Sequence, residues 1–187
     1  MSVPTAGGTP RRGATLWLTG LPSAGKTTLA RALAERLTAE GHRTEVLDGD
    51  EVREFLSKGL GFSREDRYTN VTRIGFVAQK FASLGATVLV PVIAPYADAR
   101  AAVAERHRAA GTPYLEVHVA TGLDVCSARD VKGLYAKQAA GELTHLTGVD
   151  DPYEAPEAPD LRLWTEGRAV DESVTELHRL MTEKGLA

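Results

Sequence analysis

The segment Gly20-Leu21-Pro22-Ser23-Ala24-Gly25-Lys26-Thr27 most constrains what this chain can fold into. It fits the pattern G-x-x-x-x-G-K-S/T, in which consecutive backbone N–H groups wrap a polyphosphate. A β-rich run at residues 14–19 precedes it and a helical pattern follows it. Lys26 is predicted to reach the β- and γ-phosphates of a nucleotide, and Thr27 to hold Mg²⁺. The segment therefore predicts a phosphate-binding loop between a strand and a helix.

The rest of the chain alternates short β-rich runs with longer helical patterns. We predict strands at residues 14–19, 44–48, 86–93, 114–119 and 161–164, and helices at 30–39, 71–84, 97–110 and 171–184. The nearly continuous apolar run at 86–93 is typical of a parallel strand buried on both faces. This alternation predicts an α/β fold of the P-loop NTPase type, with a mostly parallel sheet in a three-layer α/β/α arrangement.

Composition narrows the classes of partner. The 187 residues carry 22 Lys and Arg against 25 Asp and Glu, a net charge of −3, which disfavours nucleic-acid binding through phosphate neutralisation. A single cysteine, Cys126, excludes an internal disulfide and a multi-cysteine metal site. Without a long apolar run we expect no membrane partner, and we expect a cytoplasmic protein. Residues 1–12 are predicted to be a disordered tail, and 13–187 a single domain.

Two aspartates, Asp48 and Asp50, follow the predicted second strand. Ligands of open α/β sheets bind at the carboxyl ends of the strands, so both acids are expected near the phosphate-binding loop. One can serve Mg²⁺ through water, and the other can orient or deprotonate an attacking hydroxyl. Which acid does which stays open, and Asp-Gly-Asp is also good turn chemistry.

A second group of residues is suited to an anionic, aromatic acceptor. Arg53, Arg67 and Asn70 offer planar, directional donors, and Phe62 offers a ring on which a base can stack. The chain contains no Asn-Lys-x-Asp sequence for reading guanine. A small kinase therefore fits best. A kinase for another nucleotide or metabolite, and a catalytically silent nucleotide binder, remain as alternatives.

Several further segments, taken with these, resemble the adenylylsulfate kinase family. The matching segments, in the family's order, are Gly20 to Thr28, Asp48-Gly49-Asp50 with Arg53, Gly61-Phe62-Ser63 with Asp66-Arg67 and Asn70, Pro95-Tyr96, Arg129-Asp130 with Lys132-Gly133-Leu134-Tyr135, and Thr147-Gly148-Val149-Asp150-Asp151-Pro152-Tyr153-Glu154. The last two are distinctive, whereas the phosphate-binding loop is generic.

The resemblance implies transfer of the ATP γ-phosphoryl to the 3′-hydroxyl of adenosine 5′-phosphosulfate, with ATP and Mg²⁺ required, by a homodimer. It implies catalytic roles for Lys26, Asp48 and Asp50, with Thr27 and Asp48 serving the metal. It assigns the nucleotide to Gly20, Leu21, Pro22, Ser23, Ala24, Gly25, Lys26, Thr27, Thr28 and Arg129. It assigns the acceptor to Asp50, Arg53, Phe62, Arg67, Asn70, Ile93, Lys132, Gly133, Leu134 and Leu146. A mobile lid is expected at roughly 129–160, to exclude water from the reaction.

Two departures from the family's pattern matter. Members often carry Ile-Ser-Pro-Tyr where this chain has Ile93-Ala94-Pro95-Tyr96. Ala94 has no hydroxyl, so a phosphoserine intermediate at this position is excluded and direct in-line transfer is expected. Many members have Phe-Thr-Gly where this chain has Leu146-Thr147-Gly148, which predicts weaker stacking on the acceptor rather than loss of function.

Overall fold

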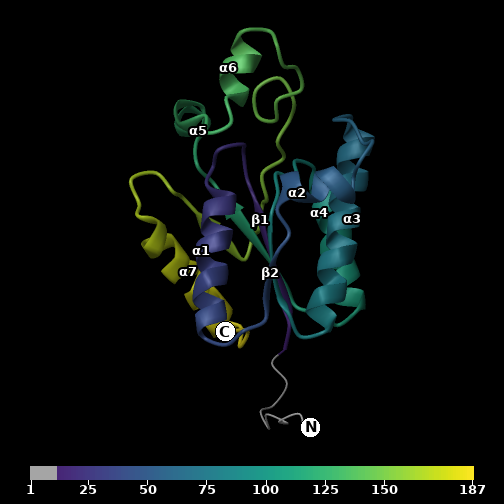
Figure 1. Ribbon diagram of the computed structural model, residues 1–187, viewed down its shortest axis with the longest axis vertical. Helices are drawn as coiled ribbons and strands as arrows, with labels where there is room; N and C mark the ends of the chain where they lie inside the picture. The colour runs from purple at the N-terminus through teal and green to yellow at the C-terminus, as the bar shows by residue number, and fades with distance from the viewer. Residues whose placement is uncertain (1–11) are drawn as a thin grey trace, which may run out of the picture.

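The structure, a computed structural model, describes residues 12–187 (Figure 1). Five strands form one parallel sheet in the order β2-β3-β1-β4-β5. The strands are β1 (Ala14–Thr19), β2 (Thr44–Val46), β3 (Thr87–Pro91), β4 (Tyr114–Val119) and β5 (Leu161–Leu163). The helices are α1 (Lys26–Ala39), α2 (Gly49–Phe55), α3 (Arg64–Ser83), α4 (Ala97–Ala109), α5 (Leu123–Arg129), α6 (Leu134–Ala139) and α7 (Val170–Glu183).

Helices cover both faces of the sheet, which confirms the three-layer α/β/α fold. Helices α1 and α7 pack on one face, and α3 and α4 pack on the other (Figure 1). Alternate residues of β1 point to opposite faces: Leu16 and Leu18 join the core under α1 and α7, and Trp17 joins the core under α3 and α4. All residues of β3 are buried, as predicted for a parallel strand covered on both faces.

The predicted elements all exist, although several boundaries differ. Strand β2 ends at Val46 rather than at residue 48, because Asp48 caps α2: its side chain accepts a hydrogen bond from the Asp50 N–H at 3.0 Å. Helix α3 begins at Arg64 rather than at residue 71, since Ser63 caps it by accepting from Asp66 N–H at 3.1 Å. Helices α2, α5 and α6 were not predicted, and each is only six or seven residues long.

The chain outside the sheet and its covering helices lies mostly at one end. Helices α5 and α6 and the connection that follows them stand beyond the carboxyl ends of the strands (Figure 1). Among the helices of residues 12–187, none is long and apolar enough to cross a membrane. Of the predicted tail, residues 1–11 lie outside the described part, and Arg12 donates a hydrogen bond to the Gly111 carbonyl at 3.4 Å.

Candidate active site

The phosphate-binding loop joins β1 to α1 at the carboxyl edge of the sheet. Gly25 has a φ of 100°, which glycine adopts readily, and α1 begins at the next residue, so that its N-terminus faces the loop. Ser23 also lies in the left-handed region, with a φ of 60°. Thr28 is exposed on the first turn of α1. The predicted strand–loop–helix context is therefore present.

Lys26 is held inside the loop. Its Nζ donates hydrogen bonds to the carbonyls of Gly20 at 2.9 Å and Leu21 at 2.7 Å. The pKa of Lys26 is lowered to about 8, mainly by burial and also by the nearby Lys132 ammonium, although Cys126, Asp50 and Asp48 act in the opposite direction. The ammonium is thus satisfied by the loop's own carbonyls and lies where a phosphate can replace them.

Asp48 joins the loop to α2. Its Oδ2 accepts a hydrogen bond from Thr27 Oγ1 at 2.9 Å, while its Oδ1 accepts from the Asp50 N–H. Asp48 is 8% exposed, and protein donors orient both of its carboxylate oxygens. A hydroxyl and a carboxylate held together in this way are oxygen ligands of the kind that Mg²⁺ prefers.

Asp50 lies one residue beyond the start of α2 and faces the lid segment. Its carboxylate forms an ion pair with the Lys132 ammonium, and both side chains are more than half exposed. The two predicted aspartates are therefore in different settings. Asp48 is buried beside Thr27, whereas Asp50 is open to solvent and to an incoming hydroxyl.

Arg53 and Phe62, both predicted to bind the acceptor, lie together. The guanidinium of Arg53 lies 4.5 Å from the ring centroid of Phe62, and its Nη1 donates to the Gly61 carbonyl at 3.0 Å. Phe62 is 56% exposed, so part of its surface is open for stacking. The structure thus brings together two of the predicted acceptor residues.

Arg67 is predicted to bind an anionic acceptor, but in the structure its guanidinium is already engaged by other parts of the protein. The side chain is buried, and it donates to the Phe62 carbonyl at 2.8 Å, to Thr147 Oγ1 at 3.0 Å and to the His145 carbonyl at 2.7 Å. It also pairs with Asp151 at 3.1 Å. Arg67 therefore ties α3 to the segment 145–151, and its contact with an acceptor stays a prediction.

Asn70 lies one helical turn beyond Arg67 and is 9% exposed. Its Oδ1 has no hydrogen-bond partner within the described part of the chain. Buried polar atoms are normally satisfied, so an unpaired amide oxygen here is consistent with a ligand-binding role. The role of Asn70 in binding an acceptor stays a prediction.

The lid segment contacts the phosphate-binding loop at two points. The hydroxyl of Tyr135 donates to the Pro22 carbonyl at 3.1 Å, and the Val131 N–H donates to Ser23 Oγ at 3.3 Å. Arg129 instead binds Thr165, with Nη1 donating to its hydroxyl at 2.7 Å and Nη2 to its carbonyl at 3.0 Å. Thr165, which the sequence analysis missed, follows β5 at the carboxyl edge of the sheet, and that position could have revealed it.

The remaining predicted acceptor residues are spread around this region. Gly133 precedes α6 with a φ of 66°, and Leu134 is partly buried against the core under α1 and α7. Leu146 is 5% exposed and belongs to that core, so direct contact with an acceptor requires movement of its loop. Ile93 is half-buried after β3. An open pocket of about 540 Å³ is lined by Leu21 of the phosphate-binding loop and by residues 148–153.

This fold and this site define a P-loop phosphotransferase of the small-kinase type. The sequence profile of the adenylylsulphate kinase family matches residues 12–164. The chain therefore belongs to that family, as the resemblance implied.

Individual relatives agree with this assignment. The chain is 52% identical over 171 residues to an adenylyl-sulfate kinase of Myxococcus xanthus, covering 91% of this chain and 92% of the relative. The Mycobacterium tuberculosis APS kinase, solved in complex with AMPPNP and APS, superposes with a TM-score of 0.90 at 45% identity, covering 92% of this chain and 99% of that one. A hexameric APS kinase from Thiobacillus denitrificans has a TM-score of 0.72 at 37% identity, covering 95% of this chain and 30% of that one.

Proposed function

We propose that this protein transfers the γ-phosphoryl group of ATP to the 3′-hydroxyl of adenosine 5′-phosphosulfate, giving 3′-phosphoadenosine 5′-phosphosulfate. The observation that carries the proposal is the placement of Asp50, which lies beside the phosphate-binding loop and faces Lys132 of the lid segment. This carboxylate is the one available to an acceptor hydroxyl, since both oxygens of Asp48 are engaged. Family membership and the relative that binds AMPPNP and APS support the choice of substrates.

The nucleotide end of the reaction uses Lys26, Thr27 and Asp48. Replacement of the two loop carbonyls by phosphate oxygens gives Lys26 a charged partner near the transferring group. Thr27 and Asp48 would hold Mg²⁺, which supplies neutralisation of the β- and γ-phosphate charge when bound. Mg²⁺ is commonly held by one or two protein oxygens together with substrate phosphates and water, so this small ligand set fits it.

The acceptor end of the reaction uses Asp50. The 3′-hydroxyl oxygen attacks the γ-phosphorus, the bond to the β–γ bridging oxygen breaks, and ADP leaves with that electron pair. The hydroxyl proton passes to the Asp50 carboxylate. Lys132 competes with the hydroxyl for this carboxylate, so acceptor binding rearranges the ion pair between them. Arg53, Phe62 and Asn70 would hold the nucleotide of the acceptor.

The transfer is direct. Ala94 offers no nucleophilic oxygen, so no phosphoenzyme forms at that position. The two bound nucleotides therefore exchange the phosphoryl group in one in-line step. We further propose that the protein is a cytoplasmic homodimer, and light scattering on the purified chain tests its assembly. The hexameric relative supports self-association in the family without fixing the number of subunits.

A coupled assay of ADP release tests the reaction. Purified protein is given Mg·ATP with adenosine 5′-phosphosulfate, with AMP, or with no acceptor, and Lys26→Ala serves as the inactive control. We expect release only with the phosphosulfate. Release with AMP would indicate a different nucleotide kinase, and ATP binding without any release would indicate a silent nucleotide binder.

A further inference from the structure

Residues 93–95 follow β3, and each of their three backbone carbonyls accepts a hydrogen bond from another part of the protein. The carbonyl of Ile93 accepts from Thr19 Oγ1 at 2.5 Å, and that of Pro95 accepts from the Glu154 N–H at 2.8 Å. Between them, the carbonyl of Ala94 accepts from Arg100 Nη1 at 2.8 Å. The three donors come from β1, from the end of the lid segment and from α4. The position of residues 93–95 is therefore determined jointly by nearby α4 and by two segments, β1 and the lid segment, that are distant in sequence.

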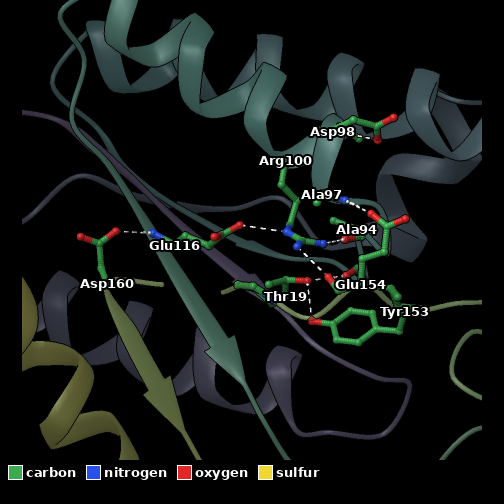
Figure 2. Close-up of polar contacts among 12 residues, drawn as sticks. Thr19, Ala94, Ala97, Asp98, Arg100, Glu116, Tyr153, Glu154 and Asp160 are labelled. Carbon is green, nitrogen blue, oxygen red and sulfur yellow. Dashed lines mark hydrogen bonds and ion pairs between the residues drawn. The ribbon is translucent and has the colours of Figure 1, made fainter. Parts of the chain in front are cut away.

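Arg100 is the centre of this arrangement. Its side chain is 4% exposed, and Figure 2 shows its guanidinium directed at three acceptors. In addition to the Ala94 carbonyl, Nη2 donates to the Glu154 carbonyl at 2.7 Å and Nε donates to Glu116 Oε1 at 3.0 Å. A planar guanidinium can hold two carbonyls and a carboxylate at once, whereas a lysine ammonium on a flexible stem cannot reproduce that fork.

The residue that Arg100 holds is in an unfavourable backbone conformation. Ala94 has a φ of 44°, which a residue with a Cβ adopts only when its surroundings enforce it. Because the charged hydrogen bond from Arg100 fixes the Ala94 carbonyl, it opposes relaxation of this residue. The direction of the chain from Ile93 to Pro95 thus depends on the guanidinium.

The same network fixes the end of the lid segment. The hydroxyl of Thr19 donates to Ile93, so the hydroxyl of Tyr153 is the donor in its 3.0 Å contact with Thr19 (Figure 2). Glu154 Oε2 accepts from the N–H of Ala97, the first residue of α4, at 2.7 Å. Residues 153–154, which lie inside the predicted lid of 129–160, are therefore anchored to the sheet and to α4.

The residues that directly precede this segment pack against the start of α2. A Cβ placed on Gly49 would lie 3.2 Å from Val92 Cγ1, so the end of β3 packs closely against the start of α2, where Asp50 lies. Displacement of residues 93–95 would therefore change the wall of the acceptor site. The link of this network to the phosphate-binding loop runs through Thr19, the last residue of β1, which directly precedes the loop.

We infer that Arg100 is a positioning residue for the acceptor: it fixes residues 93–95, which continue the chain from the contact of Val92 with the start of α2, and it anchors the lid segment at Glu154. This inference rests on the proposed function for its kinetic consequence. Its structural part, the anchoring of two separate segments by one guanidinium, can be tested without catalysis.

The experiment compares Arg100→Lys with Val103→Ala, a control on the same helix. Val103 is 1% exposed and apolar, so its truncation weakens the packing of α4 without removing a hydrogen bond from residues 93–95. For Arg100→Lys we expect the acceptor KM to rise about tenfold, as for the loss of one charged hydrogen bond, with the ATP KM changed less than about threefold. For Val103→Ala we expect a lower Tm and both KM values within about twofold of the native protein.

Hydrogen exchange gives a readout that does not depend on activity. The amides of Glu154 and Ala97 should exchange at least about tenfold faster in Arg100→Lys than in Val103→Ala, because both are bonded within the network. Glu116→Gln, which removes only the charge that holds Nε, should show the same pattern to a smaller degree. It replaces Arg100→Lys if that variant does not fold.

The outcomes separate the two proposals. Absence of phosphosulfate-dependent release by the native protein would reject the proposed function, while the exchange rates would still test the anchoring. If the amides of Glu154 and Ala97 exchange as slowly in folded Arg100→Lys as in the native protein, the anchoring is overturned. Equal effects on the acceptor and ATP KM values, or the same acceptor effect in Val103→Ala, would overturn the positioning role.

Discussion

Lys132 and Asp50, which are 82 positions apart in the chain, form an ion pair that joins the lid segment to the start of α2. The pair lies beside Lys26, whose pKa responds to both charges. In this conformation the carboxylate assigned to the acceptor hydroxyl is already neutralised by the lid. We therefore propose that acceptor binding and rearrangement of the lid segment are coupled through this carboxylate.

Replacing Lys132 with Gln should reduce activity without reducing stability. The pair is more than half exposed on both sides, and exposed ion pairs contribute about 0–1 kcal/mol to folding. We expect thermal unfolding to shift by less than about 5 °C, with at least a tenfold loss in kcat. Calorimetry and steady-state kinetics measure the two effects. A large loss of stability with normal kcat would show that the pair is structural.

The two aspartates should respond differently to conversion into Asn. Asp50→Asn removes the proposed base and should lower kcat about 10²- to 10⁴-fold, with ATP affinity nearly unchanged. Asp48→Asn should instead raise the Mg²⁺ concentration needed for half-maximal rate. The reason is that Asp48 accepts a hydrogen bond from Thr27, the other residue proposed to hold the metal. Titration of Mg²⁺ for each variant distinguishes them. A higher Mg²⁺ requirement in Asp50→Asn alone would exchange the two assignments.

Arg67→Ala should be strongly destabilising as well as harmful to acceptor binding. It leaves the Asp151 carboxylate unpaired in a mostly buried site, a change that typically costs about 3–5 kcal/mol. Arg64→Ala, on the same helix and in exposed ion pairs with Asp98 and Glu154, should destabilise the protein far less. Urea unfolding compares the two variants. An acceptor KM unaffected in folded Arg67→Ala would remove Arg67 from the acceptor site.

Nucleotide binding should take up a proton above pH 8. With a pKa of about 8, Lys26 is mainly protonated below that pH and mainly neutral above it in the empty protein. Bound phosphate favours the charged form, so the pKa of Lys26 rises on binding and ATP affinity falls as the pH rises through 8. We expect the uptake to be small below pH 7 and to approach one proton per nucleotide above pH 9, because Lys26 is mainly neutral in the empty protein there.

Calorimetric titrations in buffers of different ionisation enthalpy measure this uptake. Lys26→Arg provides the control, because an arginine stays charged throughout this range and should take up no proton on binding. Equal uptake in the native protein and in Lys26→Arg would assign the titration to another group.

Gly148→Ala should disturb the phosphate-binding loop. Gly148 has a φ of 88°, and an added Cβ would lie 2.4 Å from Leu21 Cδ2. Gly141 is the matched control, since its φ of 75° imposes similar strain but an added Cβ meets nothing within 4 Å. We expect both variants to lose about 1–2 kcal/mol from backbone strain, and only Gly148→Ala to bind ATP more weakly. Leu21→Ala should remove that difference, and its persistence would contradict a steric cause.

Sequence patterns predicted the layers of the fold better than the helix boundaries. Buried strands and amphipathic helices have periodicities that a linear pattern records, and β3 followed its pattern closely. The starts of α2 and α3 depend on caps by Asp48 and Ser63, which a search for apolar spacing overlooks. Helices α5 and α6 are too short for a periodic pattern to identify.

The candidate site also contains some residues that the sequence predicts and others that it does not. The phosphate-binding loop and the aspartates that follow β2 were predictable, because a contiguous segment or the end of one strand defines each of them. Arg100 carried no such signal: it is one of three arginines in an alanine-rich helix, and its acceptors lie on three other segments.

By itself, the sequence determined the class of fold, the phosphate-binding loop, the location of the acids at the carboxyl edge and the family. These properties follow from local spacing and from the rule that parallel strands present their carboxyl ends at one edge. Only the tertiary structure decided which charges meet: Lys132 on Asp50, Arg67 on the segment 145–151, and Arg100 between residues 93–95 and Glu154. The physical reason is that a side chain's partners are chosen by burial and geometry across the folded chain, where separations of 54 to 82 positions obey no local pattern.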